Sequence, residues 1–183
     1  SISKPESSAT ATTPSIVAWL LPHAGRDPSA LIGGVFANFA GSFRLGEGPH
    51  FVIEGDEYDP AFFDKTPKSL HYDARTLLVT SVEFDHADIY GSVEQVQDAF
   101  RTLVAAIPAD GVIIAASDAD TVRAVLTGAR AKVEGYGFRD GAVWRVSDVA
   151  FDPEGTQFTV WRHDARVARV RMPMHGRHNV ENV

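Results

Sequence analysis

The sequence predicts an α/β domain with a mostly parallel sheet, helices on both faces of that sheet, and a small antiparallel β layer near the C-terminus. Three apolar runs predict buried strands, and helical patterns lie between them; the runs are 51–53, 77–82 and 111–116. Strands that are apolar throughout and alternate with helices are typical of a parallel sheet covered on both faces. In such sheets ligands bind beyond the carboxyl ends of the strands, so we expect the functional residues there.

The composition supports one well-packed domain and excludes several functional classes. The chain has 183 residues, of which 44% are hydrophobic, a net charge of −7 and no cysteine. This charge argues against binding to nucleic acid or to an anionic membrane surface, because phosphate groups select clustered positive charge. No apolar run approaches the roughly 20 residues of a membrane span, and the N-terminus lacks the apolar centre of a signal peptide. We therefore expect a cytoplasmic protein without disulfides or thiolate metal sites.

The first predicted element is a helix near the N-terminus. Residues 1–13 are rich in Ser, Thr and Ala and are expected to form a flexible lead-in to a domain that spans 14–183. The helix is expected to begin at 13–15, where a hydroxyl cap precedes Pro14. Pro22 and Gly25 are expected to end the helix, whose apolar face consists of Ile16, Val17, Trp19, Leu20 and Leu21.

Two further helices are predicted on either side of the strand at 111–116. Ser92 and Gln95 have the spacing of a capping box, and the apolar residues that follow share one helix face: Val93, Val96, Phe100, Leu103, Val104 and Ile107. A shorter helix with Val122, Val125 and Leu126 on one side is expected to be capped by Asp118 or Asp120.

The pattern changes in the segment 132–172, which predicts the antiparallel layer. Short strands are expected at 136–138, 142–146, 157–162 and 167–172. Turn-forming residues at 139–141 and 152–155 separate them.

Two acidic clusters follow the first two apolar strands. The first contains Glu54, Asp56, Glu57 and Asp59, and the second contains Glu83, Asp85, His86 and Asp88. Carboxylates are the ligands that Mg²⁺ prefers, and a histidine beside them can bind a metal or act as a general base. If both strands belong to one sheet, the clusters meet around a shared cation. The alternatives are solvated loops with a surface histidine, or the metal site of a hydrolase.

A third group of polar residues ends the sequence. His175, Arg177 and His178 precede or begin a predicted helical turn, and Asn179 and Asn182 lie on one face of it. Their amides could hydrogen-bond the edge of an adenine. The alternative is that Asn179 only caps the helix.

Four segments resemble motifs of the Mur ligase superfamily, whose members form amide bonds in peptidoglycan synthesis with ATP: 31–35, 51–65, 83–89 and the Gly-x-His-Asn-x-x-Asn motif at 176–182. The similarity covers 14–183 and implies the P-loop-like central, ATP-binding domain of such an enzyme. The flanking domains, which bind the UDP group at the N-terminal side and further substrate at the C-terminal side, are expected to lie outside these residues. The motif around Glu54 is most similar to the branch that joins UDP-N-acetylmuramate to the tripeptide L-alanyl-γ-D-glutamyl-meso-diaminopimelate, and less similar to the branch that uses L-alanine.

The resemblance also implies residue roles. It places Mg²⁺ on Glu54 and His86, with Glu57 in the same cluster, and it places adenine on His178, Asn179 and Asn182. The implied reaction is phosphorylation of the muramoyl carboxylate by ATP, followed by attack of the amino group of the acceptor on the acyl phosphate. Mg²⁺ offsets the charge on the transferring phosphoryl group.

The sequence departs from the superfamily in the phosphate-binding loop. Members have a loop of the Gly-Thr-His-Gly-Lys-Thr-Thr type before the first helix, and the corresponding stretch here is 7–13. Counting without gaps, the lysine position falls on Thr10 and the metal-binding hydroxyl position on Ala11; a shift of one residue brings Thr12 or Thr13 to the hydroxyl position. We therefore expect weak nucleotide binding by this chain alone. The rival hypothesis is a non-catalytic binding or scaffold domain.

Overall fold

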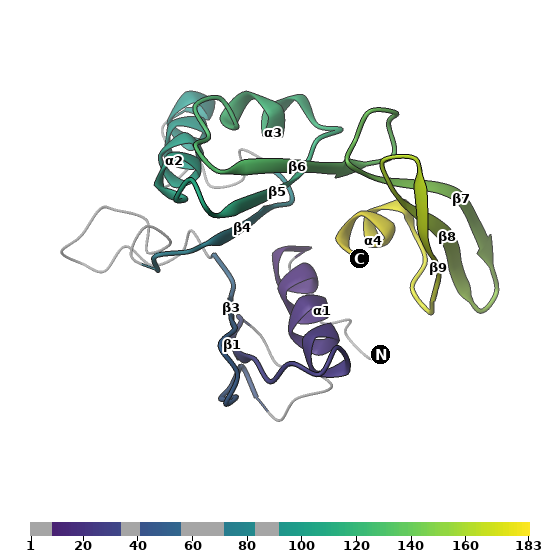
Figure 1. The fold of residues 1–183 in the computed structure, drawn as a ribbon. Coiled ribbons are helices and arrows are strands. Elements are labelled where there is room, and N and C mark those ends of the chain that lie inside the picture. The colour runs from purple at the N-terminus through teal and green to yellow at the C-terminus, as the bar shows by residue number, and fades with distance from the viewer. Residues whose placement is uncertain (1–8, 34–40, 56–71, 83–91) are drawn as a thin grey trace, which may run out of the picture. The chain divides into compact units, whose positions relative to one another are not determined.

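The computed structural model describes residues 9–33, 41–55, 72–82 and 92–183, and these form two compact units (Figure 1). The first unit comprises Ser1–Asp59 together with Asn182–Val183, and the second comprises Pro60–Glu181. Each unit has its own sheet and its own buried residues.

A helix and a three-stranded sheet make up the described part of the first unit. The elements are α1 (Ala9–His23), β1 (Ser29–Leu31), β2 (Phe43–Arg44) and β3 (Phe51–Ile53). The strand order is β2-β1-β3; β1 is parallel to β3 and antiparallel to β2. The small core consists of Ala18 from α1 and of Ala30 and Ile32 from the β1 segment, with Val52 packed against it. The side chain of Ala18 therefore holds α1 against one face of this sheet.

The start of α1 differs from the prediction. The helix begins at Ala9 rather than at Thr13, so order begins before the expected end of the lead-in, and Pro14 and Pro22 both lie inside it. A proline has a backbone φ that suits a helix, and what it removes is one N–H donor. Because Pro14 stands early in α1, the carbonyl that loses this donor belongs to the first turn. Trp19 and Leu20, expected on the apolar face, are exposed.

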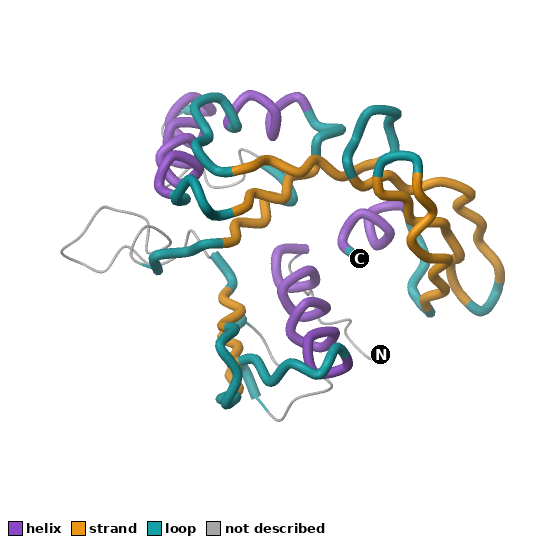
Figure 2. Tube along the Cα trace, viewed as in Figure 1, coloured by secondary structure: helices purple, strands orange, loops and turns teal. Residues whose placement is uncertain are grey.

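The second unit is built on a six-stranded sheet with the order β4-β5-β6-β7-β8-β9 (Figure 2). Strands β4 to β7 are parallel, and β7, β8 and β9 pair antiparallel. The elements in chain order are β4 (Thr76–Val79), α2 (Val93–Ala106), β5 (Val112–Ala116), α3 (Asp120–Val125), β6 (Lys132–Gly137), β7 (Trp144–Asp152), β8 (Gly155–Arg162), β9 (Ala165–Met172) and α4 (Arg177–Asn182). The predicted fold class, a mixed sheet with helices and an antiparallel strand group near the C-terminus, is confirmed.

The predicted start of the antiparallel layer is wrong. The antiparallel layer does not begin at Lys132, because β6 is parallel to both of its neighbours and antiparallel pairing starts between β7 and β8. Within the units, β3 belongs to the three-stranded sheet of the first and β4 to the six-stranded sheet of the second. The strand at 51–53, predicted to be buried, has Phe51 exposed and Val52 and Ile53 half-buried.

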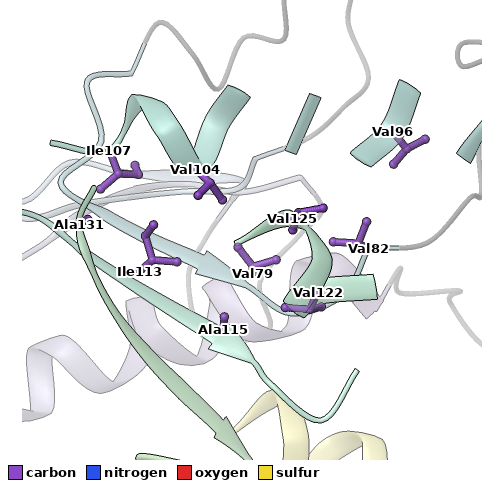
Figure 3. Packing of buried hydrophobic residues seen from close by; sticks show 10 residues of the cluster. All are labelled: Val79, Val82, Val96, Val104, Ile107, Ile113, Ala115, Val122, Val125 and Ala131. Carbon is purple, nitrogen blue, oxygen red and sulfur yellow. The ribbon is translucent and has the colours of Figure 1, made fainter. Parts of the chain in front are cut away.

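The main core lies between α2, α3 and the parallel strands, as Figure 3 shows. Val104 of α2, Ile113 of β5 and Val122 of α3 are fully buried there. As predicted, Ser92 caps α2: its side chain accepts a hydrogen bond from the backbone N–H of Gln95. Val93, predicted on the apolar face, is instead exposed.

The helix α4 lies on the side of the sheet opposite α2 and α3 (Figure 1). Val180 of α4 is buried in a cluster with Phe158 of β8 and Met172 of β9. This packing fixes α4 next to the antiparallel strands. Among the described helices, none combines the length and the apolar character that crossing a membrane requires.

A buried carboxylate connects β6, β7 and β8. Glu134 is only 8% exposed and accepts hydrogen bonds from Lys132 Nζ at 2.6 Å, Trp144 Nε1 at 2.7 Å and Arg162 Nη2 at 3.2 Å. These donors, the Lys132 ammonium first, lower the pKa of Glu134 to about 2. The charge is thus satisfied by side chains from three neighbouring strands, which holds the parallel and antiparallel parts of the sheet together.

Candidate functional site

Glu54 lies directly after β3, at the carboxyl end of that strand. Its backbone N–H donates to Leu31 O at 3.0 Å, and its carboxylate Oε2 accepts from the backbone N–H of Gly33 at 2.6 Å. A Cβ on Gly33 would lie 3.1 Å from Oε2, so the absence of a side chain there leaves room for the carboxylate. Oε2 is therefore held in place, and among the described residues no hydrogen bond is made to Oε1, which could bind a metal ion.

Thr12 and Thr13 belong to the same unit and lie in α1. Thr13 is 7% exposed, and its hydroxyl has no hydrogen-bond partner among the described residues. Thr13 lies five residues before Ala18, about 7.5 Å along the helix, and Ala18 packs against the β1 segment. No hydrogen bond joins the hydroxyl of Thr13 to Glu54.

The remaining residues of the predicted metal site, Glu57 and His86, lie outside the described residues. The predicted pairing of Glu54 with His86 around one ion thus stays a prediction. Of the strands before the two clusters, β3 lies in the sheet of the first unit and β4 in the sheet of the second. Within the described ranges, no three His, Asp or Glu side chains gather closely enough to hold a metal ion.

The C-terminal motif forms the short helix α4, which begins after Gly176. Gly176 has φ of +102°, a conformation that favours glycine, and a Cβ there would lie 2.6 Å from Cε1 of His178. The imidazole of His178 therefore lies over the bare backbone of Gly176. His178 is exposed, while Asn179 and Asn182 are half-buried.

The side chain of Asn179 does not cap the start of α4. Its Nδ2 donates a hydrogen bond to the backbone carbonyl of His175 at 2.7 Å. A carbonyl accepts and cannot donate, so this contact decides which end of the amide is the nitrogen. The Oδ1 atom of Asn179 is consequently presented as an acceptor. His175 itself contacts the backbone carbonyl of Asp152 through Nε2 at 2.8 Å.

Arg177, named in the sequence, contacts Phe138, which was not singled out there and which directly follows β6. The guanidinium of Arg177 lies 3.8 Å from the ring centroid of Phe138, and its Nε lies 3.8 Å from Glu181 Oε1. Burial, with the negative charge of Glu181 in addition, raises the pKa of Tyr136 to about 12. Tyr136 thus keeps its proton at neutral pH. The aromatic residues at 136 and 138, at the end of a predicted strand, are the only signal that could have indicated this contact.

A small hollow of about 280 Å³ lies near the carboxyl ends of β5 and β6. Its lining includes Ser117, Asp118, Arg123 and Arg139. Asp118, predicted as a helix cap, instead accepts the backbone N–H groups of Phe138 at 2.7 Å and Arg139 at 3.2 Å. The residue before α3 is Ala119, which makes no side-chain cap. The Asp118 carboxylate is thus satisfied by two backbone N–H groups directly after β6 rather than at the start of α3.

Comparison with known proteins decides the family. The sequence pattern of the Mur ligase middle domain matches residues 43–183. The chain belongs to this family. It is 36% identical, over 171 residues, to a UDP-N-acetylmuramate–L-alanyl-γ-D-glutamyl-meso-2,6-diaminoheptandioate ligase of Haemophilus influenzae. It is 33% identical, also over 171 residues, to a UDP-N-acetylmuramate–L-alanine ligase of Chlorobium phaeobacteroides.

The fold of this Mur ligase middle domain agrees with the family. The crystal structure of the UDP-N-acetylmuramate:L-alanyl-γ-D-glutamyl-meso-diaminopimelate ligase from Neisseria meningitides matches with a TM-score of 0.84 and 37% identity, over 94% of this chain and 55% of that chain. The matches to the two relatives cover 93% of this chain but only 37% and 35% of theirs. The Mur ligase middle domain described here thus spans little more than a third of the relatives' length.

Proposed function

We propose that this chain is the nucleotide-binding part of an ATP-dependent ligase that joins UDP-N-acetylmuramate to a peptide during the synthesis or recycling of peptidoglycan in the cytoplasm. The observation that carries the proposal is the arrangement of the Gly-x-His-Asn-x-x-Asn motif on α4, in a chain 36% identical to a ligase of that specificity. Peptide is favoured over L-alanine because the identity to the L-alanine ligase is lower, at 33%.

The proposed adenine site consists of His178, Asn179 and Asn182. The free Oδ1 of Asn179 suits the 6-amino group of adenine, which donates hydrogen bonds, and it does not suit the 6-oxo group of hypoxanthine or guanine, which accepts them. The exposed imidazole of His178 offers a flat surface against which a purine can stack. The buried Val180 anchors the helix that carries all three residues.

The proposed metal ligand is Glu54. A carboxylate with one oxygen held by Gly33 N–H and the other available fits Mg²⁺, which binds through one or two carboxylates together with substrate phosphates. When bound, the ion would offset negative charge on the transferring phosphoryl group. Glu57 and His86 are proposed as further ligands on the basis of the family motif alone.

The test uses the full-length protein that contains this chain. It is supplied with ATP, UDP-N-acetylmuramate and either the tripeptide L-alanyl-γ-D-glutamyl-meso-diaminopimelate or L-alanine, and the released phosphate and the mass of the product are measured. We expect an amide product with the tripeptide and at least tenfold less with L-alanine. A preference for L-alanine would reassign the acceptor, and no product with either would reject the ligase function.

One observation favours a second candidate, a binding domain without catalysis. Thr10 and Ala11 stand where the family loop has its lysine and its metal-binding hydroxyl. In that case the full-length protein would bind UDP-N-acetylmuramate but release no phosphate from ATP with either acceptor. Calorimetry with the UDP sugar, run beside the ligase assay, separates this outcome from a protein that is simply unfolded.

A further inference from the structure

The strand β9 ends the six-stranded sheet, and only one of its two edges is paired (Figure 1). It pairs antiparallel with β8 from Ala165 to Met172, and no other described segment makes a backbone hydrogen bond to it. In an antiparallel strand, alternate residues direct both N–H and C=O to the same side, so the other edge of β9 presents a row of donors and acceptors. An extended peptide can add to such an edge as a further strand.

Three arginines of β9 lie on one face of the sheet, and all three are exposed: Arg166, Arg169 and Arg171. They stand opposite residues of β8 that are two positions apart, because a register shift after Val160 accommodates the extra residue between Arg166 and Arg169. Side chains two positions apart on a strand are separated by about 7 Å along it. Carboxylates at the turn between β7 and β8 neutralise one end of this row, where Arg171 pairs with Asp152 at 3.1 Å and with Glu154 at 2.6 Å.

The other two arginines have no such partner. Arg166 stands opposite Trp161, and the described residues give it no ion pair. The charge of Arg169 acts on the carboxylate of Asp148, whose Oδ2 accepts from the Ser147 hydroxyl at 2.8 Å, but no ion pair joins Arg169 to Asp148. Two guanidinium groups beside an open strand edge are therefore available to the carboxylates of a partner, with which arginine forms charge-assisted hydrogen bonds.

The opposite face of β9 is apolar. Met172 is buried with Phe158 and Val180, and Val170 packs against this cluster. Ala168, on the same face, is half-buried. Because successive side chains of a strand point to opposite faces, a strand added to β9 would place every second side chain beside Ala168 and Val170. The remaining side chains would lie beside the arginines. The segment that fits this edge thus alternates between acidic and apolar residues.

We propose that the free edge of β9 binds an extended peptide segment in which acidic and apolar residues alternate. The backbone of the segment pairs with β9, and its carboxylates lie beside Arg166 and Arg169. A second copy of β9 is a poor partner, because like charges placed opposite each other across two strands are destabilising. A nucleic acid is also a poor partner, because it has no peptide backbone to continue the sheet and the net charge of −7 repels a polyanion.

The experiment titrates the full-length protein that contains this chain into a labelled peptide of alternating Glu and Val and follows fluorescence anisotropy. A control peptide of the same composition carries all its Glu residues before its Val residues and should bind more weakly. Two further peptides have backbone N-methyl groups on every second residue, in one phase or in the other. Only one edge of an added strand is paired, so one phase should abolish binding and the other should change the Kd by less than about threefold. Equal binding of all four peptides would overturn strand addition.

A charge reversal on β9 tests the place of binding. Arg169→Glu should weaken binding of the alternating peptide about fivefold or more, because an attractive cross-strand pair becomes repulsive. The matched control is Arg75→Glu, at an exposed arginine that pairs with Asp110, and it should change the Kd by less than about twofold. Equal effects of the two variants would overturn the assignment to β9. So would tighter binding of a single-stranded oligodeoxynucleotide of the same charge, a dimer in sedimentation velocity that the peptide does not dissociate, or no binding of the peptide.

Discussion

The carboxylate of Glu54 accepts a 2.6 Å hydrogen bond from the backbone N–H of Gly33, and this contact ties the residue after β3 to the segment that follows β1. The two strands are parallel neighbours, so the contact lies at the carboxyl end of both. A side chain that is held in this way keeps its position before any ligand arrives, which is what a metal ligand needs.

Replacement of Glu54 separates its structural role from its proposed role in metal binding. Glu54→Gln keeps an oxygen that accepts from Gly33 but removes the charge, whereas Glu54→Ala removes both. We expect the free energy of unfolding of this chain to fall by about 1 kcal/mol for Glu54→Ala and by less than about half of that for Glu54→Gln. In the full-length protein both variants should lower turnover about 100-fold or more. Wild-type turnover in Glu54→Gln would reject Glu54 as a metal ligand.

Gly176→Ala tests whether the backbone of the motif positions His178. The new Cβ meets both an unfavourable positive φ and the imidazole of His178. Gly128→Ala is the matched control, because Gly128 also has a positive φ, of +88°, but open space around it. Both should lower the free energy of unfolding by about 1–2 kcal/mol, measured in urea. Only Gly176→Ala should weaken adenosine binding, at least fivefold; equal binding by both variants would show that His178 has no part in it.

The pKa of Glu134 predicts a pH dependence of stability. Because the pKa in the folded protein, about 2, lies below its usual value of 4.5, the ionised carboxylate stabilises the fold above pH 4.5, and this stabilisation is lost as the pH falls toward 2. Glu134→Gln should therefore flatten the fall of Tm between pH 5 and pH 2.5. The control Asp110→Asn removes an exposed ion pair with Arg75 and should leave that slope unchanged. A slope that Glu134→Gln does not alter would contradict the low pKa.

Truncation of Glu134 to alanine is expected to lower the stability of the fold. Glu134→Ala leaves the indole N–H of Trp144 without its acceptor and removes the partner of Lys132 and Arg162. We expect the free energy of unfolding at pH 7 to fall by about 2 kcal/mol, measured by urea denaturation. Trp144→Phe, which removes the donor instead, should recover part of the loss when it is combined with Glu134→Ala. Strict additivity of the two changes would argue that the hydrogen bond contributes nothing.

Substitutions at Ser92 test the predicted cap at the start of α2. Ser92→Ala removes the acceptor for the N–H of Gln95 and should lower the free energy of unfolding by about 1 kcal/mol, while Ser92→Thr keeps it and should change stability by less than about half of that. Chemical denaturation of the two variants side by side gives the comparison. An equal loss in both would show that the cap is not what stabilises the start of α2.

Local sequence patterns were sufficient to predict several of the helices, strands and turns. The helix after Ser92, the strand at 112–116 and the turn between Asp152 and Gly155 all follow from residues that are close in the sequence. Capping, apolar periodicity and turn chemistry act over a few residues, so their effect can be read before the fold is known. The motif at 176–182 was likewise found in the sequence, because its residues lie on one short helix.

The sequence by itself therefore determined the fold class, the family resemblance and the candidate residues Glu54, His178, Asn179 and Asn182. Only the tertiary structure decided that β6 is parallel to β7, that Asp118 accepts from the N–H of Phe138 rather than capping α3, and that Arg177 lies over Phe138. Each of these depends on which distant segments meet. A pattern of apolar and polar residues predicts the type of a local element. Which distant segment packs against that element depends on the packing of the whole chain.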